Sequence, residues 1–90
     1  MEIKRTATAG TLESNDALVQ VSPAAGGLSV ELNSIVEKLY GDHIVSLIHS
    51  LAESMDVHNA RIVVEDRGAL DFAIEARVEA ALLRAGREDD

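Results

Sequence analysis

Leu28-Ser29-Val30-Glu31-Leu32-Asn33 alternates apolar and polar side chains, and Ser34-Ile35-Val36-Glu37 follows it directly. The alternation places the two leucines and the valine on one face and the polar side chains on the other, which is typical of a strand with one buried face. Ser34 and Glu37 have the spacing of a capping box, in which the serine hydroxyl accepts a hydrogen bond from a helical amide and the glutamate reaches back. The sequence therefore predicts a strand that ends near Asn33 and a helix that starts at Ser34.

Apolar residues recur with a period near 3.6 along this helix, so one of its faces is expected to be buried. The stripe comprises Val36, Tyr40, Ile44, Leu47, Ile48, Leu51 and Met55. Gly41 is the weak point, because glycine in a helix interior costs about 1 kcal/mol relative to alanine. Two possibilities stay open: the helix runs through Gly41, or its first turn is irregular and the main helix begins near Asp42.

A second strand and a second helix follow. The β-branched run at residues 60–65 predicts the strand, and Asp66-Arg67-Gly68 interrupts it before a helical stripe at residues 69–85. Gly86 suits the C′ position of that helix, and residues 87–90 have nothing to pack against, so they are expected to fray. The part from residue 28 to residue 65 could be a crossover connection between two parallel strands.

The N-terminal part predicts a β-hairpin. Strand-like runs at residues 5–12 and 17–21 are separated by the polar tetrapeptide Glu13-Ser14-Asn15-Asp16. Pro23 and the glycine pair Gly26-Gly27 then favour a turn that ends the second strand.

These elements together predict an α+β fold. We expect a two-layer sandwich, with two helices on one face of a mixed sheet of about four strands, in the order β-β-β-α-β-α. No linker or internal repeat divides the sequence, so residues 1–90 are expected to form a single domain.

Composition narrows the classes of function. Ninety residues with 47% apolar content support one modest core, which favours a subunit or module over a self-contained enzyme. Eight basic and sixteen acidic side chains give a net charge of −8, which argues against nucleic acid and membrane surfaces as partners. The charged N-terminus and the lack of a long apolar run predict a cytoplasmic location. Without cysteine, the chain has no thiol of its own to carry an acyl group.

Ser14 is the candidate functional residue. Local chemistry alone favours a turn residue, because serine, asparagine and aspartate suit tight turns. No histidine lies in the segment to act as a base, so Ser14 is a poor catalytic serine, and we predict no catalytic residue. A hydroxyl at a hairpin tip is nevertheless a candidate for modification by another enzyme.

Two other patterns are weighed in the same way. His43 and His49 are six residues apart on a helix and point in different directions, so we predict no metal site. Asp71, Glu75 and Glu79 form an acidic ladder that is best explained as a solvated helix face, with docking of a basic partner surface as the alternative.

Three ordered segments carry a family resemblance. Residues 9–16, Ala-Gly-Thr-Leu-Glu-Ser-Asn-Asp, resemble the prosthetic-group attachment segment of the citrate lyase acyl carrier protein (gamma subunit) family. Residues 34–42 resemble the family's stretch before its first helix. Residues 65–71, Glu-Asp-Arg-Gly-Ala-Leu-Asp, followed by residues 76–80, resemble its later signature and last helix. Asn15 stands where the family has serine or glycine, and Phe72 replaces a common cysteine.

The resemblance implies a carrier. Ser14 would be esterified with 2′-(5″-phosphoribosyl)-3′-dephospho-CoA by a prosthetic-group transferase, and the terminal thiol would bear an acetyl group. Citrate would displace acetate on the alpha (transferase) subunit, and the beta (lyase) subunit would cleave the citryl thioester to oxaloacetate and the acetyl thioester. The alternatives are citramalate lyase, the carrier subunit of malonate decarboxylase, which uses a Ser-Gly-Asp turn, and an unmodified adaptor that binds a partner protein.

Overall fold

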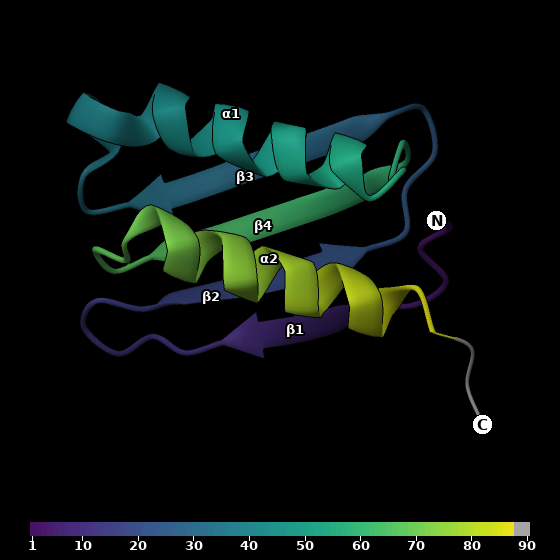
Figure 1. The fold of residues 1–90 in the computed structure, drawn as a ribbon, viewed down its shortest axis with the longest axis horizontal. Coiled ribbons are helices and arrows are strands. Elements are labelled where there is room, and N and C mark those ends of the chain that lie inside the picture. The colour runs from purple at the N-terminus through teal and green to yellow at the C-terminus, as the bar shows by residue number, and fades with distance from the viewer. Residues whose placement is uncertain (88–90) are drawn as a thin grey trace.

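Two helices cover one face of a four-stranded sheet in the computed structural model, which describes residues 1–87 (Figure 1). The elements in chain order are β1 (Ala7–Gly10), β2 (Ala17–Ser22), β3 (Leu28–Ser34), α1 (Glu37–Ser54), β4 (Ala60–Asp66) and α2 (Asp71–Ala85). The sheet order is β1-β2-β4-β3. β1 and β2, and β2 and β4, are antiparallel, whereas β3 and β4 are parallel. The predicted α+β sandwich with a mixed sheet and the order β-β-β-α-β-α is therefore confirmed.

The core lies between the central strands and the helices. β2 and β4 are paired in the middle of the sheet, with Val19 opposite Val64 and Val21 opposite Ile62. All four of these side chains are fully buried, and so are Ile74, Val78, Ala81 and Leu82 on α2. Because alternate residues of a strand face the same side, the β-branched residues of β2 and β4 fill the layer that the helices close.

The junction between β3 and α1 differs from the predicted capping box. Ser34 is the last residue of β3, and α1 begins at Glu37 with Val36 as its N-cap and no side-chain cap hydrogen bond. The Ser34 hydroxyl donates instead to a carboxylate oxygen of Asp66 at 2.7 Å and accepts the Val36 amide at 3.1 Å. A buried carboxylate needs donors, and Asp66 recruits this hydroxyl across 32 residues.

The start of α1 settles the question about Gly41. The helix runs through this glycine, which is buried, so the irregular first turn is wrong. Tyr40 was expected on the buried stripe, but it is exposed. Figure 1 shows the reason: the first turn of α1 extends beyond the end of β3, where no strand lies behind it.

The end of α2 also differs in detail from the expectation. Gly86 is the C-cap with a right-handed φ of −84°, so it is not the left-handed C′ glycine of the prediction. A Cβ at this position would lie 2.7 Å from the sulfur of Met1, which indicates that glycine allows the N-terminal segment to pack closely there. Of the tail that was expected to fray, Arg87 donates its amide to Arg84 at 3.4 Å, and residues 88–90 lie outside the described residues.

Asp66 is the one buried charged residue in the described part of the chain, and it generates the first prediction. Its carboxylate accepts hydrogen bonds from the Ser34 hydroxyl and from the Ala69 amide at 2.9 Å. Asp66→Ala leaves these donors without a partner, so we expect the free energy of unfolding to fall by about 2–3 kcal/mol. Asp66→Asn keeps one acceptor and should cost less. Urea unfolding followed by circular dichroism measures both, and equal stability of Asp66→Ala and the wild type would contradict this role.

Candidate functional site

Ser14 lies at the tip of the β1–β2 hairpin. The Asp16 amide donates to the Glu13 carbonyl at 3.2 Å, which closes a four-residue turn with Ser14 and Asn15 at its centre. Of these two, Asn15 alone has a positive φ, at 64°, which is the pattern of a type II turn and suits asparagine or glycine. The Ser14 side chain is exposed, as the sequence predicted, so its hydroxyl is accessible.

Asp16 fixes the base of the turn. Its carboxylate accepts hydrogen bonds from the Thr11 hydroxyl at 2.6 Å and from the Ala17 amide at 2.7 Å. Arg77 of α2 donates to both carboxylate oxygens, from Nε at 2.9 Å and from Nη2 at 2.8 Å. Two parallel bonds of this kind between planar groups restrict orientation as well as distance. The hairpin tip is therefore held against the helix layer at the residue two positions after Ser14.

These contacts also set the ionisation of Asp16. The Arg77 hydrogen bonds, followed by those from Thr11 and Ala17, hold the pKa of the Asp16 carboxyl well below its usual range. The same pairing raises the pKa of Arg77. Asp16 is therefore a fixed anion that is neutralised by its partner, and it is not available as a base for Ser14.

The turn is tied to a second loop through the backbone. The Asn15 amide donates to the Arg67 carbonyl at 2.8 Å, and the Arg67 amide donates to the Asp16 carbonyl at 2.9 Å. Arg67 lies in the loop between β4 and α2, next to Gly68, which has a φ of +85°. A Cβ on Gly68 would lie 3.3 Å from Ile35 and 3.7 Å from Asn15. Three loops therefore meet at the Ser14 end of the molecule, on the left of Figure 1.

Gly10 explains part of the local sequence before Ser14. It has a φ of +97°, and a Cβ would lie 1.8 Å from the Ala17 carbonyl oxygen. No side chain fits there, so the strand can turn into the Ser14 loop only with glycine at this position.

The surroundings of Ser14 offer no means of activating it. Within residues 1–87 its hydroxyl has no hydrogen-bond partner, and His43 and His58 are bonded to Asp71 at 2.6 Å and to Asp56 at 2.7 Å. No group of three histidine, cysteine, aspartate or glutamate side chains among the described residues could hold a metal ion. The turn exposes the Ser14 oxygen and holds the backbone beneath it rigid. This arrangement suits a residue that another enzyme modifies.

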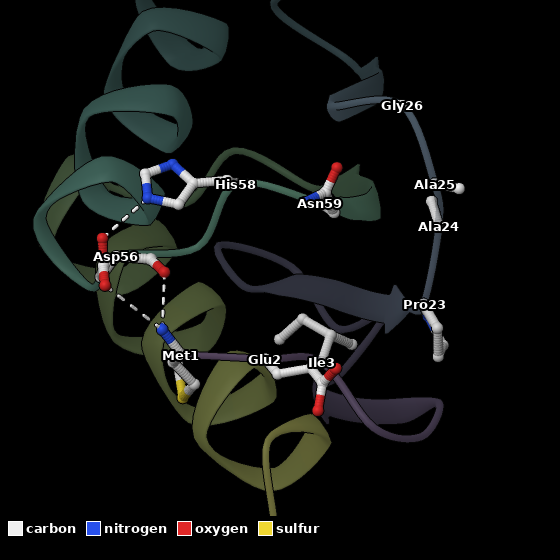
Figure 2. A pocket seen from close by; sticks show the side chains of 10 residues that line it. All are labelled: Met1, Glu2, Ile3, Pro23, Ala24, Ala25, Gly26, Asp56, His58 and Asn59. Atoms are coloured by element: carbon white, nitrogen blue, oxygen red, sulfur yellow. Dashed lines mark hydrogen bonds and ion pairs between the residues drawn. The ribbon is translucent and has the colours of Figure 1, made fainter.

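A hollow of about 650 Å³ lies at the opposite end of the molecule, near the N-terminus (Figure 2). Its rim comprises Met1, Glu2, Ile3, Pro23, Ala24, Ala25, Gly26, Asp56, His58 and Asn59. The Met1 amino group donates to the Asp56 carbonyl at 2.6 Å, and the His58 hydrogen bond, together with this amino group, lowers the pKa of the Asp56 carboxyl. The hollow shares no residue with the Ser14 turn and is not part of this site.

The sequence singled out Ser14 as the candidate site residue, which stays a prediction, and it missed the Asp16–Arg77 pair. Asp16 was read as an acidic neighbour in the turn, and Arg77 lies 61 residues away on another element. No spacing rule links such residues. The bidentate contact becomes visible only when α2 is packed against the sheet.

Comparison with known proteins first defines the class of protein to which the fold belongs. A family model described as "ACP: Malonate decarboxylase delta subunit (MdcD)" matches residues 4–85. A chain in the crystal structure of a Pseudomonas malonate decarboxylase hetero-tetramer in complex with malonate has the same fold, with a TM-score of 0.82 and 22% sequence identity. This match covers 93% of the present chain and 87% of the other. The fold is thus that of a chain found in a multi-subunit decarboxylase.

Curated relatives are more specific. The citrate lyase acyl carrier protein of Halothermothrix orenii is 49% identical over 87 residues, which cover 97% of this chain and 93% of the relative. That of Cronobacter sakazakii is 44% identical over 85 residues, covering 94% and 88%. That of Haemophilus ducreyi is 42% identical over 88 residues, covering 98% and 92%. The chain belongs to the citrate lyase acyl carrier protein family.

Gly10 provides a test of the hairpin geometry. Gly10→Ala combines a positive φ with a backbone clash, so we expect it to lower the free energy of unfolding by more than about 2 kcal/mol. Gly26→Ala is the matched control, because Gly26 also has a positive φ but a Cβ there would meet nothing within 4 Å. It should cost only about 1 kcal/mol. Urea titration compares the two variants. Equal losses in the free energy of unfolding would contradict the clash at Gly10.

Asp16 gives a prediction for the pH dependence of stability. Its folded pKa is depressed, so the stability it contributes is present above its ordinary pKa of 3.8 and is lost as the pH falls below that value. Asp16→Asn should therefore be less stable than the wild type at pH 7, and the difference should shrink at pH 3. Urea unfolding at the two pH values measures this. A difference that grows toward low pH would be inconsistent with an ionised Asp16.

Proposed function

We propose that this chain is the acyl carrier subunit of a citrate or citramalate lyase and that Ser14 is the residue to which its prosthetic group is attached. The observation that carries the proposal is an exposed serine hydroxyl at the tip of a turn whose base is fixed on two sides. Membership of the citrate lyase acyl carrier protein family supports it. The chain itself then has no catalytic residue and acts as a carrier.

The proposed group is 2′-(5″-phosphoribosyl)-3′-dephospho-CoA, joined to Ser14 Oγ through a phosphodiester bond. When bound, it supplies a terminal thiol that holds the acyl group as a thioester. Two features of the chain fit such a group. The protein has no cysteine, so any sulfur nucleophile must be imported. The Ser14 side chain is exposed, so a bulky substituent on its oxygen displaces no part of the core.

Formation of that bond requires a second enzyme. The Ser14 oxygen would attack the α-phosphorus of the triphosphate in a triphosphoribosyl-dephospho-CoA precursor, and pyrophosphate would leave. A base on the prosthetic-group transferase would accept the hydroxyl proton. This division agrees with the surroundings of Ser14, because the neighbouring Asp16 is held as a neutralised anion by Arg77. The residues of this chain present the oxygen and keep it in place.

The proposed partners are the alpha (transferase) and beta (lyase) subunits. Tethering makes the acyl transfer and the cleavage effectively intramolecular and raises the local concentration of the acyl group at each active site. A net charge of −8 is consistent with protein partners and with no binding to nucleic acid or membrane. No helix in the described range of the chain is long and apolar enough to span a bilayer. A cytoplasmic location stays a prediction.

The second candidate is the carrier subunit of malonate decarboxylase. The matching family model and the shared fold favour it, but the structural match has only 22% identity. The curated citrate lyase relatives have between 42% and 49% identity over almost the whole chain, and this favours the lyase. An unmodified adaptor is the remaining alternative, in which Ser14 is only a turn residue.

Mass spectrometry of the intact protein from its native host tests the proposal. We expect the wild type to carry the mass of one phosphoribosyl-dephospho-CoA group, located on the peptide that contains Ser14. Ser14→Ala should fold normally, because an exposed substitution changes stability by about 0.5 kcal/mol or less, and should carry no adduct. Ser29→Ala, at an exposed serine on β3, is the matched control and should be modified like the wild type.

The outcomes separate the candidate functions. An adduct on another residue would overturn the assignment of Ser14. If the chain is unmodified in the native, active complex, the adaptor alternative would be favoured. Co-purification with a decarboxylase in place of a lyase would favour the second candidate.

A further inference from the structure

Large apolar side chains gather at the Ser14 end of the molecule without being covered. We call the following five residues the end patch: Ile35, Leu39, Tyr40, Leu70 and Phe72. Their exposed fractions lie between 55% and 80%. Soluble monomers rarely expose large apolar side chains in groups, and a group of this kind commonly marks a binding surface.

Three residues of the end patch, Tyr40, Leu70 and Phe72, line a groove between the start of α1 and the start of α2. The groove has a volume of about 610 Å³. It is lined by Val36, Tyr40, His43, Ile44, Ala69, Leu70, Asp71 and Phe72. His43 of α1 and Asp71 of α2 are joined across its edge, with 2.6 Å between Nε2 and Oδ2. The two helices are thus linked at the groove.

A short series of contacts connects the groove to Ser14. Asn15, the residue after Ser14, is hydrogen-bonded to Arg67 through the backbone. Two residues further along the chain, Ala69 lines the groove, and Leu70 follows it. Ile35 lies beside Gly68, which connects the patch to the same loop. Figure 1 places the β1–β2 loop and the start of both helices at one end of the molecule.

The charge around the patch is predominantly acidic. In the segments that meet at this end, residues 11–16, 35–44 and 65–77, the described acidic side chains are Glu13, Asp16, Asp42, Glu65, Asp66, Asp71 and Glu75, and the basic ones are Lys38, Arg67 and Arg77. Asp16 and Arg77 neutralise each other, and Asp66 is buried. Asp71 and Glu75 also begin the acidic ladder of α2. A partner that covers the apolar centre would therefore meet mostly negative charge at its rim, and a surface with lysine or arginine around an apolar centre is complementary to it.

We propose that the end patch is the docking surface for the catalytic subunit that receives the arm of Ser14, and that this subunit presents an apolar centre with a basic rim. The inference rests on the proposed function, because an active site that accepts a group from Ser14 must approach this end. A second copy of this chain is a poor occupant, since two acidic rims would repel each other. The arm itself would not cover Ile35 and Leu39, which lie outside the lining of the groove.

Binding measurements with single-residue variants test the proposal. Leu70→Ala and Phe72→Ala each remove an exposed apolar side chain from the patch. Leu83→Ala is the matched control, because Leu83 is an exposed leucine near the other end of α2. The probe is the pair of catalytic subunits purified with this chain from its native host and separated from it. We expect each patch variant to bind at least tenfold more weakly, which corresponds to about 1.4 kcal/mol, and the control to remain within twofold.

The design separates failure of the docking surface from failure of the proposed function. Binding is measured with the full chain carrying Ser14→Ala as well as with the wild type, so the result does not depend on the arm. Thermal unfolding of each variant should match the wild type, because the altered side chains are exposed. Weakening of the wild-type interaction by added salt would support the charged rim.

Three results would overturn the docking proposal. The first is equal binding by Leu70→Ala, Phe72→Ala and the control. The second is loss of self-association alone, which would identify a second copy as the occupant. The third is weakened binding only when the arm is present, which would assign the groove to the arm.

Discussion

The end of β4 holds the three loops that meet at the Ser14 end of the molecule. Asp66 is buried at the last position of the strand, where its carboxylate holds the β3–α1 junction through Ser34 and the β4–α2 loop through Ala69. The next residue, Arg67, holds the Ser14 turn through two backbone hydrogen bonds. β4 itself cannot shift, because it lies between β2 and β3 and its inward side chains are fully buried. The position of Ser14 is therefore set by the core, although Ser14 itself is exposed.

The proposed arm of Ser14 would rest on a rigid body. A swinging group needs freedom beyond its point of attachment, but the attachment must not move if the same active sites are to be reached in each cycle. The Asp16–Arg77 pair supplies the rigidity on the helix side, and the contacts with Arg67 supply it on the sheet side. Ser14 projects between these two anchors with no partner of its own among the described residues.

Local patterns in the sequence predicted the elements well, whereas contacts between distant residues escaped them. The alternation at residues 28–33 and the helical stripes reflect burial of one face, which is a local property, and the structure has these elements. The capping box at Ser34 failed because Ser34 still belongs to β3, where it pairs with Asp66, and α1 begins only at Glu37. Its hydroxyl donates to the Asp66 carboxylate and accepts the Val36 amide. The exposure of Tyr40 could not be predicted either, since helical periodicity does not report where the sheet beneath the helix ends.

The comparison with malonate decarboxylase separates what the core determines from what the surface determines. A fold retained at 22% identity shows that this sandwich can be built from very different sequences. Under the proposed function, the fold alone therefore does not choose which acid is processed. A carrier that holds its acyl group at the end of an arm makes that choice indirectly, through the enzymes that it meets. Under the proposed function, selection of those enzymes falls to exposed side chains near Ser14. The end patch offers them, because its apolar residues lie in or just before the first turns of both helices and contribute little to the core. Their exposure is costly in water, and a cost of this kind is explained most simply by a partner that covers them.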